Sequence, residues 1–294
     1  MDAATSSNLA RSAERTEPDL AHALLAVLAD AGPLVVALSG GVDSTLLAVA
    51  AHKSDPGSLA VTANSASLAT GELDQCRSLA EQFGFAWQSV DTDELTDPRY
   101  LANDHDRCFW CKTALMDQLQ PVADGRTVVL GVNVDDLGDH RPGQRAAAER
   151  GAWFPLVEAG LTKEEIRRLA RYWDIPVWDR PAMPCLSSRI PYGTTVSVPL
   201  LSRIDRAEAI LRELGFDDVR VRHYHDTARI ELPAAELAAA AGMAEQIVER
   251  FSAVGYRYVT LDLAGLRSGN LNHVVDLAVS RDADPVVTAT ANAR

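Results

Sequence analysis

A glycine-rich turn between a strand and a helix is the feature that most constrains this chain. The turn reads Ser39-Gly40-Gly41-Val42-Asp43-Ser44. The apolar run before it, residues 33–38, predicts a buried parallel strand, and the run after it, residues 45–51, predicts a helix. Glycine accepts positive φ and lets backbone N–H groups approach an anion, and a helix N-terminus adds partial positive charge. We therefore expect a phosphate site here instead of an ordinary glycine turn.

The turn differs from the Walker phosphate loop because it lacks the Gly-Lys-Ser/Thr ending. It resembles the signature of the PP-loop ATP pyrophosphatases, which bind ATP and cleave it between the α- and β-phosphates. The resemblance implies that all six residues of the turn bind ATP with Mg²⁺, and that AMP is transferred to a substrate oxygen. It also implies that Asp43 helps to organise the metal–pyrophosphate group. The turn does not identify the substrate.

Strand-like and helical runs alternate through the first part of the chain. Further strands are predicted at residues 58–63, 86–90 and 127–131, and a short extended segment at 175–178. Helices are predicted at residues 19–30, 71–83, 109–120 and 163–173, the last with Thr162 and Glu165 as a capping box. Alternation of this kind predicts an α/β fold with a parallel sheet, in which ligands bind at the carboxyl ends of the strands.

The pattern changes after a loop rich in proline and serine, residues 179–195. Beyond it we predict helices at residues 199–214 and 234–251 and strands at 218–223, 228–232 and 256–263. The expected organisation is a disordered tail (1–17), a PP-loop ATP pyrophosphatase domain (18–195), a small α+β substrate or oligomerisation domain (196–280) and a second tail (281–294).

The composition limits the classes of binding partner and the cellular compartment that we expect for this protein. The net charge of −13 argues against a broad nucleic-acid surface. No apolar run reaches the length of a membrane span, and residues 1–17 lack the hydrophobic region of a signal peptide. We therefore expect a cytoplasmic protein without membrane or nucleic-acid partners. In that compartment four cysteines suggest metal or sulfur chemistry instead of disulfides.

Three of the four cysteines form a candidate set. Cys108 and Cys111 make one CxxC pair, and the second pair that a zinc site usually needs is missing. Cys185 stands alone in the proline- and serine-rich loop, whereas Cys76 falls within a helix and is expected to be buried. Three thiolates suit a [4Fe-4S] cluster with one iron open to an outside ligand. The alternative for the CxxC pair alone is two structural thiols.

Two further groups of polar residues lie where ligands are expected. Asn133 and Asp135 follow the fourth strand and face the nucleotide edge of the sheet, although a solvated turn would have the same composition. Arg220 and Arg222 alternate along one strand and share a face that suits an oxyanion, the alternative being two surface arginines. His223 is expected to be structural or exposed.

Over about residues 33–272 the chain resembles the LarE family, the ATP-dependent sulfur transferases that build the nickel-pincer nucleotide of lactate racemase. The matching blocks are Ser39–Ser44, Arg107–Lys112, Gly131–Gly143, Pro181–Gly193 and Val219–Glu231. The block around Cys185 is the most specific of them. The resemblance implies adenylation of a pyridinium carboxylate on a nicotinate-derived mononucleotide. Sulfur then replaces AMP to give a thiocarboxylate, and two carboxylates are treated in turn.

The family has two sulfur sources. In one branch the cysteine at the Cys185 position gives up its own sulfur and becomes dehydroalanine. In the other branch three cysteines hold a [4Fe-4S] cluster whose unique iron carries a hydrosulfide. Because this chain has the CxxC pair as well, the cluster branch fits better, with Cys108, Cys111 and Cys185 as iron ligands. The sacrificial branch, which needs no cluster, stays open.

The resemblance also assigns the remaining functional roles of the family to matched positions in this chain. They are Arg220 and Arg222 for the substrate phosphate, Glu208 and Glu231 for a cation beside it, and Ser188 and Arg189 near the reacting carboxylate. The resemblance also implies a homohexamer of trimers with the small domain at the interface, and other nickel-pincer biosynthesis enzymes as partners. Glu208 and Glu231 would otherwise be surface charges.

Three other functions compete with this one. A PP-loop tRNA thiolase would need a nucleic-acid surface that fits poorly with the net charge. An ammonia-using amide synthetase would leave the three cysteines without a role. A nucleotide-sensing module would have the loop without the cysteine set.

Overall fold

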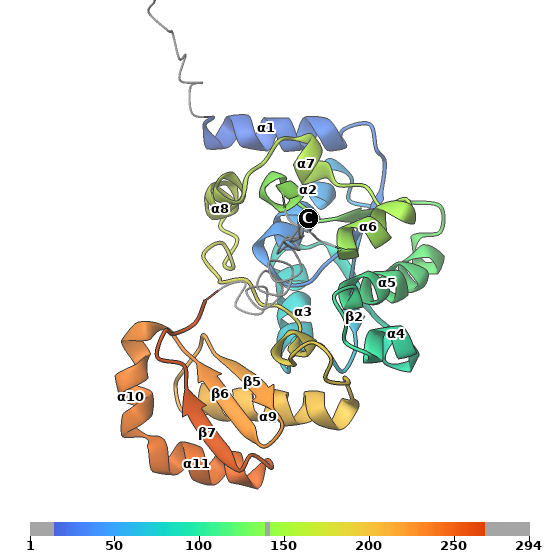
Figure 1. Ribbon diagram of the computed structural model, residues 1–294. Helices are drawn as coiled ribbons and strands as arrows, with labels where there is room; N and C mark the ends of the chain where they lie inside the picture. Colours follow the sequence, from blue (N-terminus) through green and yellow to red (C-terminus); the bar gives the residue numbers. More distant parts are fainter. Residues whose placement is uncertain (1–14, 139–141, 268–294) are drawn as a thin grey trace, which may run out of the picture. The chain divides into compact units, whose positions relative to one another are not determined.

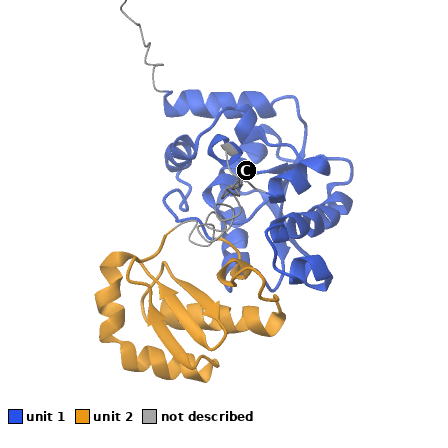
Figure 2. Cartoon of the chain, in the orientation of Figure 1, with its two compact units in different colours: residues 1–183 blue, residues 184–294 orange. Residues whose placement is uncertain are grey.

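The computed structural model describes residues 15–138 and 142–267. The chain divides into two compact units, residues 1–183 and 184–294 (Figure 2). This boundary precedes the one expected between residues 195 and 196, and it falls within the proline- and serine-rich loop, so that Cys185 belongs to the smaller unit. The expected tail over 281–294 and residues 1–14 of the expected N-terminal tail lie outside the described residues.

The larger unit is built on a parallel sheet of four strands in the order β3-β2-β1-β4. The strands are β1 (Leu34–Ala37), β2 (Leu59–Asn64), β3 (Ala86–Asp91) and β4 (Thr127–Leu130). The central β1 pairs with β2 on one side and with β4 on the other, and Val35 lies opposite both Leu59 and Val128. All four predicted strands and the expected α/β class are confirmed.

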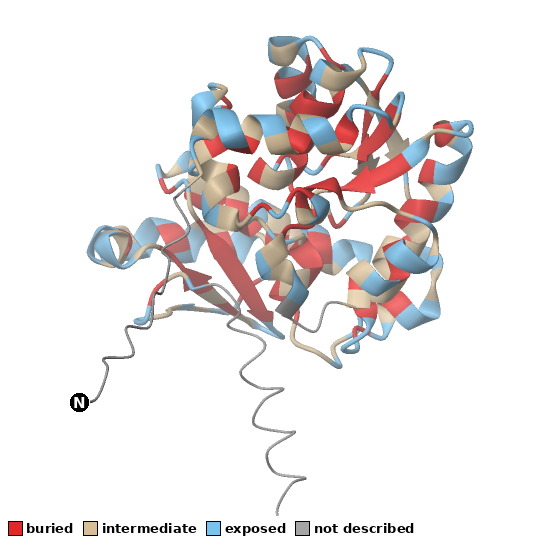
Figure 3. Cartoon of the chain, turned by 90° about the horizontal axis from the view of Figure 1, so that it is seen from above, coloured by how far each residue is buried: buried red, intermediate tan, exposed pale blue. Residues whose placement is uncertain are grey.

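Helices cover both faces of this sheet (Figure 1). One apolar core joins α1, α2, α3 and α8 to one face, and a second joins α5 and α6 to the other. The long helices are α1 (Glu17–Leu28), α2 (Val42–Ser54), α3 (Glu72–Phe83), α5 (Arg107–Ala123), α6 (Pro142–Glu149) and α8 (Lys163–Tyr172). The short ones are η1 (Glu94–Thr96), α4 (Pro98–Leu101), η2 (Val134–Gly138) and α7 (Pro155–Glu158). Figure 3 shows the buried residues along the strands and the inner helix faces.

Local capping chemistry fixes the start of α8, which matters for the site. The Thr162 side chain accepts a hydrogen bond from the backbone N–H of Glu165, and the Glu165 carboxylate accepts one from the backbone N–H of Thr162. This is the predicted capping box, and it satisfies amides that the helix leaves without partners. Because α8 begins directly after Thr162, Lys163 occupies its first turn.

The smaller unit packs helices against a three-stranded sheet in the order β5-β6-β7. Strands β5 (Arg220–Tyr224) and β6 (Thr227–Glu231) form an antiparallel hairpin, and β7 (Tyr258–Leu261) runs parallel to β6. The helices are η3 (Leu186–Arg189), α9 (Val198–Glu213), η4 (Ala234–Glu236), α10 (Leu237–Gly242) and α11 (Ala244–Ala253).

Two local predictions are wrong. Residues 175–178 form turns instead of an extended segment, with Trp178 N donating to Ile175 O at 3.2 Å. The predicted helix over 234–251 is divided, because Met243 has φ −103° and ψ 16° and ends α10 just after Gly242. Among the described residues no helix is long and apolar enough to cross a membrane.

Candidate functional site

The glycine-rich turn lies at the carboxyl end of β1 and opens α2. Ser39 N donates to Ser44 Oγ at 3.1 Å, and Ser44 Oγ donates to Gly41 O at 3.2 Å. Gly40 has φ +74°, which favours glycine. Gly41 is the N-cap of α2 and makes no side-chain cap hydrogen bond to the first amides of the helix. The serines close the turn, and the helix N-terminus stays available to an anion.

A second glycine lets β4 meet this turn at van der Waals distance. A Cβ on Gly131 would lie 2.8 Å from Ser44 N and 2.9 Å from Asp43 C, closer than real Cβ contacts come. The approach brings the loop after β4 beside the phosphate turn. Asn133, which is buried, accepts a hydrogen bond from the backbone N–H of Asp135 at 2.9 Å through Oδ1. The predicted neighbours at the strand ends are therefore close together.

Lys163 connects the phosphate turn to the loop that follows β4. Its Nζ donates to Asp43 Oδ2 at 2.6 Å, and its backbone N–H donates to Asp135 Oδ2 at 2.7 Å. The other Asp43 oxygen, Oδ1, is buried without a hydrogen-bond partner among the described residues. Burial raises the pKa of Asp43 above its ordinary value, and this effect outweighs the opposing charge of Lys163.

These groups fit a Mg²⁺–polyphosphate. A carboxylate oxygen without a partner suits a hard cation such as Mg²⁺. The amides at the start of α2 and the ammonium of Lys163 suit phosphate oxygens. Sequence reasoning missed Lys163, which lies 120 residues from Asp43 along the chain. One signal for it was available, since a lysine in the first turn of a helix opposes the helix dipole.

The CxxC pair lies on α5 in the larger unit. Cys108 is exposed and Cys111 partly buried, and the i, i+3 spacing puts both on one helix face. One of the two residues between them, Trp110, stacks under the guanidinium of Arg99, which lies 3.6 Å from the ring centroid. A Cβ on Gly143 of α6 would lie 3.1 Å from the carbonyl oxygen of Cys108. The backbone of Cys108 is therefore closely packed against α6.

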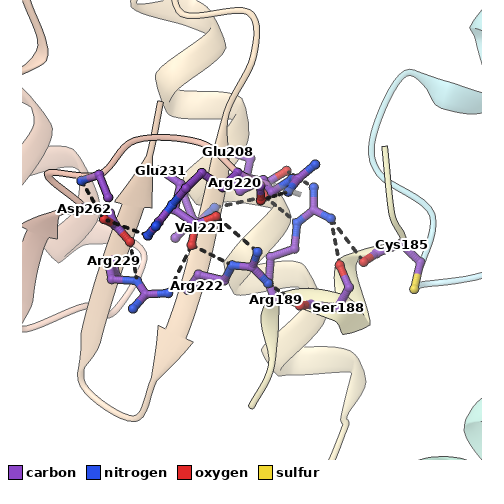
Figure 4. A network of polar contacts seen from close by, with 12 residues as sticks. Cys185, Ser188, Arg189, Glu208, Arg220, Val221, Arg222, Arg229, Glu231 and Asp262 are labelled. Atoms are coloured by element: carbon purple, nitrogen blue, oxygen red, sulfur yellow. Dashed lines mark hydrogen bonds and ion pairs between the residues drawn. The ribbon is translucent and has the colours of Figure 1, made fainter. Parts of the chain in front are cut away.

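Cys185 lies at the start of η3 in the smaller unit, where a buried ion pair fixes its backbone (Figure 4). Arg189 Nη1 donates to Cys185 O at 3.2 Å and to Ser188 Oγ at 3.0 Å. Arg189 Nε donates to Glu208 Oε1 at 2.8 Å, and both side chains are almost completely buried. None of the four cysteines, all within the described residues, forms a disulfide, and Cys76 is buried as predicted.

A second ion pair, between β5 and β6, also binds the backbone of the segment that follows Cys185. Arg222 binds Glu231 through Nε at 3.0 Å and Nη2 at 3.1 Å, while its Nη1 donates to Ser188 O at 2.7 Å. Arg220 and Arg222 are buried, each 4% exposed, and are not surface arginines. Burial, with the charges of Arg189 and Arg222, lowers the pKa of Arg220. We call Arg189, Glu208, Arg220, Arg222 and Glu231 the arginine–glutamate network.

Both glutamates of the network bind arginines in this structure. Glu208 also accepts hydrogen bonds from Arg212 Nη2 at 3.1 Å and from Val221 N at 3.1 Å. Glu231 also accepts one from Arg229 Nη2 at 3.0 Å. A cation at Glu208 and Glu231 would compete with these donors, and their role as metal ligands stays a prediction.

The three-cysteine set also stays a prediction. Cys108 and Cys111 belong to the larger unit and Cys185 to the smaller. Within the described ranges, no group of three or more His, Cys, Asp or Glu residues is assembled that would hold a metal ion. Each half of the set nevertheless fits a ligand role, since the CxxC pair shares one helix face and the backbone of Cys185 is fixed.

Comparisons with known proteins agree with this geometry. The asparagine synthase family profile matches residues 16–127, which contain the phosphate turn. An uncharacterized protein of Synechocystis is 44% identical over 82% of this chain and 92% of its own length. The pyridinium-3,5-bisthiocarboxylic acid mononucleotide synthase of Lactiplantibacillus plantarum is 38% identical over 87% of this chain and 94% of its own. An uncharacterized protein of Methanocaldococcus jannaschii is 26% identical over 80% and 91%.

The parallel sheet, the phosphate turn and the matched profile define an enzyme of the PP-loop class that uses ATP. Within that class the relationship to the L. plantarum synthase extends over both units. The chain belongs to the LarE family.

Proposed function

We propose that this enzyme uses ATP to activate a carboxylate of a nicotinate-derived mononucleotide and converts it to a thiocarboxylate. The observation that carries the proposal is the Asp43–Lys163 pair at the phosphate turn, within a chain that belongs to the LarE family. The name of the L. plantarum relative specifies a pyridinium bisthiocarboxylate, and we extend that substrate class to this chain.

The first step is adenylation. A carboxylate oxygen of the substrate attacks the α-phosphorus of ATP, an acyl adenylate forms, and pyrophosphate leaves. Charge builds on the leaving pyrophosphate, where the amides of α2, the ammonium of Lys163 and a Mg²⁺ bound by Asp43 would stabilise it.

The second step is sulfur transfer. A sulfur nucleophile attacks the acyl carbon, a carbon–sulfur bond forms, and AMP leaves with the bonding electrons of the acyl oxygen. We assign Cys108, Cys111 and Cys185 as ligands of a [4Fe-4S] cluster, which when bound would supply sulfur from outside the chain. The alternative uses the sulfur of Cys185 itself. Its Cβ–S bond breaks, a Cα proton is lost, and dehydroalanine remains.

The smaller unit is proposed to hold the substrate. Three buried guanidiniums of the arginine–glutamate network stand against two buried carboxylates, an excess of positive charge that favours an anion. Arg220, with its lowered pKa, and Arg222 are the proposed phosphate ligands. Ser188 and Arg189, which contact each other beside Cys185, are proposed to act at the reacting carboxylate. Assembly as a homohexamer, and contacts with other nickel-pincer biosynthesis enzymes, are part of the same proposal.

The test uses ATP labelled in the γ-phosphate together with nicotinate-derived mononucleotides that carry one or two pyridinium carboxylates. We expect AMP and labelled pyrophosphate as products, and a mass gain of about 16 Da for each oxygen replaced by sulfur. Asp43→Ala should abolish both signals. Orthophosphate as the direct product would disprove the adenylation step, and unchanged acceptor mass in the presence of sulfide and iron would disprove sulfur transfer.

A further inference from the structure

The segment that leads to Cys185 is fixed at Arg180 by two helices of the larger unit. Arg180 Nη1 donates to the side-chain oxygen of Gln75 on α3. Arg167 Nη2 on α8 donates to the backbone oxygen of Arg180 at 3.2 Å. The backbone N–H of Arg180 donates to the oxygen of Val177 at 3.3 Å, and Val177 is buried in an apolar core of this unit. Arg180 is therefore held through both its side chain and its backbone.

Both helices that hold Arg180 also border the phosphate turn. A Cβ on Gly40 would lie 3.9 Å from Cδ of Gln75, so the side chain that binds Arg180 packs directly against the turn. Helix α8 reaches the other end of the turn, where Lys163 donates to Asp43 at 2.6 Å. The position of Arg180 is thus set by the same elements that shape the phosphate turn.

The contact between Gln75 and Arg180 matters for its place in the chain more than for its strength. Among the described residues Arg180 forms no ion pair, and one hydrogen bond is a small part of the stability of a unit with two apolar cores. Cys185 follows five residues later, and five residues span at most about 18 Å.

The residues between these two positions form a stiff link. Two of the four are prolines, Pro181 and Pro184, and proline has a fixed φ. A stiff link passes the direction of the chain at Arg180 on to Cys185, whereas a flexible link would lose it. Loss of the contact with Gln75 would therefore widen the range of positions that Cys185 samples.

We propose that Gln75 and Arg180 are positioning residues for sulfur transfer, which keep the segment that carries Cys185 within reach of the acyl adenylate. The inference rests on the proposed function, and it holds for both sulfur sources because Cys185 takes part in each. Without the contact, adenylation continues, since Asp43 and Lys163 are unchanged. Sulfur then arrives late, and the oxygen of water attacks the acyl carbon in its place. AMP leaves, and the original carboxylate is restored.

The experiment measures the thiocarboxylate formed per pyrophosphate released in the first turnover, in water labelled with heavy oxygen. Gln75→Met and Arg180→Met should each lower this ratio by roughly 5–10-fold, because a misplaced reactant loses rate steeply. The missing product should appear as carboxylate that carries one heavy oxygen. Arg180→Lys should keep much of the ratio, and Arg77→Met, which removes an exposed cation from α3, is the matched control.

A second measurement needs no activity. Amide hydrogen exchange over residues 179–185 should become faster in both methionine variants and stay unchanged in Arg77→Met. The double variant Gln75→Met with Arg180→Met should be no worse than either single one, since all three lose the same contact.

The outcomes separate this inference from the proposed function. Absence of thiocarboxylate from the wild type would disprove the proposed function, and hydrogen exchange would still test the contact. Sulfur transfer by the wild type with an unchanged ratio in both methionine variants overturns the inference. An equal fall of pyrophosphate release and thiocarboxylate also overturns it, because that result shows general damage. Unchanged hydrogen exchange over residues 179–185 overturns it as well.

Discussion

Lys163 Nζ lies 2.6 Å from Asp43 Oδ2 and joins the first turn of α8 to the first turn of α2. The pair is partly exposed, with side chains 35% and 21% accessible. A surface ion pair of this exposure contributes little to stability. Its position at the phosphate turn, beside a buried carboxylate oxygen without a hydrogen-bond partner among the described residues, indicates a role in binding ATP.

The first prediction tests this pair. Lys163→Met should lower kcat/KM for ATP by about 10–100-fold, because one charge-assisted hydrogen bond to phosphate is lost. Lys163→Arg should retain a measurable part of the activity. Combined with Asp43→Asn, the loss should be smaller than the product of the two single losses, since both act on one group. Multiplicative losses in steady-state kinetics would contradict a shared role.

The second prediction concerns Asp43 and pH. Burial raises its pKa, so the folded state holds the proton more tightly than the unfolded chain does. Ionised Asp43 therefore lowers stability at neutral pH, and this cost disappears as the pH falls through the raised pKa. Asp43→Asn should keep or increase the Tm at pH 7 while adenylation becomes slow but stays measurable. The Tm difference from the wild type should shrink in acid, and a clearly lower Tm at pH 7 would contradict the assignment.

The phosphate turn was predictable from sequence because its geometry is local. Glycine, serine and the adjoining strand and helix signals all lie within residues 33–51, and the structure reproduces them. Lys163 was not predictable in that way, because its partner lies 120 residues away. Only a weak hint existed, a lysine in a helical position where an acidic residue is favoured.

The third prediction separates the two arginines assigned to the substrate phosphate. Arg220→Gln should raise the KM of the mononucleotide acceptor by about 10–100-fold and leave that of ATP unchanged. Arg222→Gln should in addition destabilise the protein by about 3–5 kcal/mol, because Glu231 and Ser188 O lose buried donors. Urea unfolding and initial-rate kinetics measure the two effects. Equal changes in both KM values for Arg220→Gln would show a general folding defect.

The ion pairs of the arginine–glutamate network could not be predicted from the sequence. Alternation along a strand correctly placed Arg220 and Arg222 together, and the hairpin register puts Arg220 opposite Glu231. The sequence did not reveal that Arg222 binds Glu231 or that Arg189 binds Glu208 in the protein interior. Pairings of this kind depend on three-dimensional packing, and residue spacing alone does not encode them.

The fourth prediction uses His223, which is buried beside the hydroxyl of Tyr256, with Nδ1 3.4 Å away. Burial, aided by the charge of Arg203, lowers the pKa of His223 to about 4. The unfolded chain therefore takes up the proton first, and the free energy of unfolding should fall as the pH drops from 6.5 to about 4. At about 1.4 kcal/mol per pKa unit, the loss is at most about 3 kcal/mol.

Urea unfolding of the wild type at several pH values between 7 and 4 measures this loss. His223→Gln should flatten the pH dependence, whatever its effect on absolute stability. His225→Asn, at an exposed position with φ 54° that asparagine tolerates, should change the slope far less than His223→Gln does, because the charge of His225 is a smaller cause of the lowered pKa of His223 than burial. Equal slopes in the wild type and His223→Gln would contradict the prediction.

The fifth prediction decides the sulfur source. If Cys108, Cys111 and Cys185 hold a cluster, anaerobically reconstituted protein should be brown and contain about four irons per chain. Changing any of the three to Ser should remove both the cluster and sulfur transfer. Cys76→Ser, at a buried cysteine outside the set, is the control variant. With sulfide present, the wild type should turn over repeatedly, and the peptide that carries Cys185 should keep its mass.

The sacrificial route predicts the opposite on each count. Cys108→Ser and Cys111→Ser would retain activity, sulfur transfer would stop at one atom per chain, and the Cys185 peptide would lose the elements of hydrogen sulfide. Peptide mass spectrometry after one reaction cycle distinguishes the routes without a structure of the cluster. We expect the cluster result, because the sacrificial route leaves the pair on α5 without a function. The packing of Gly143 against the backbone of Cys108 and of Arg99 on Trp110 would then serve to fix two of the ligands.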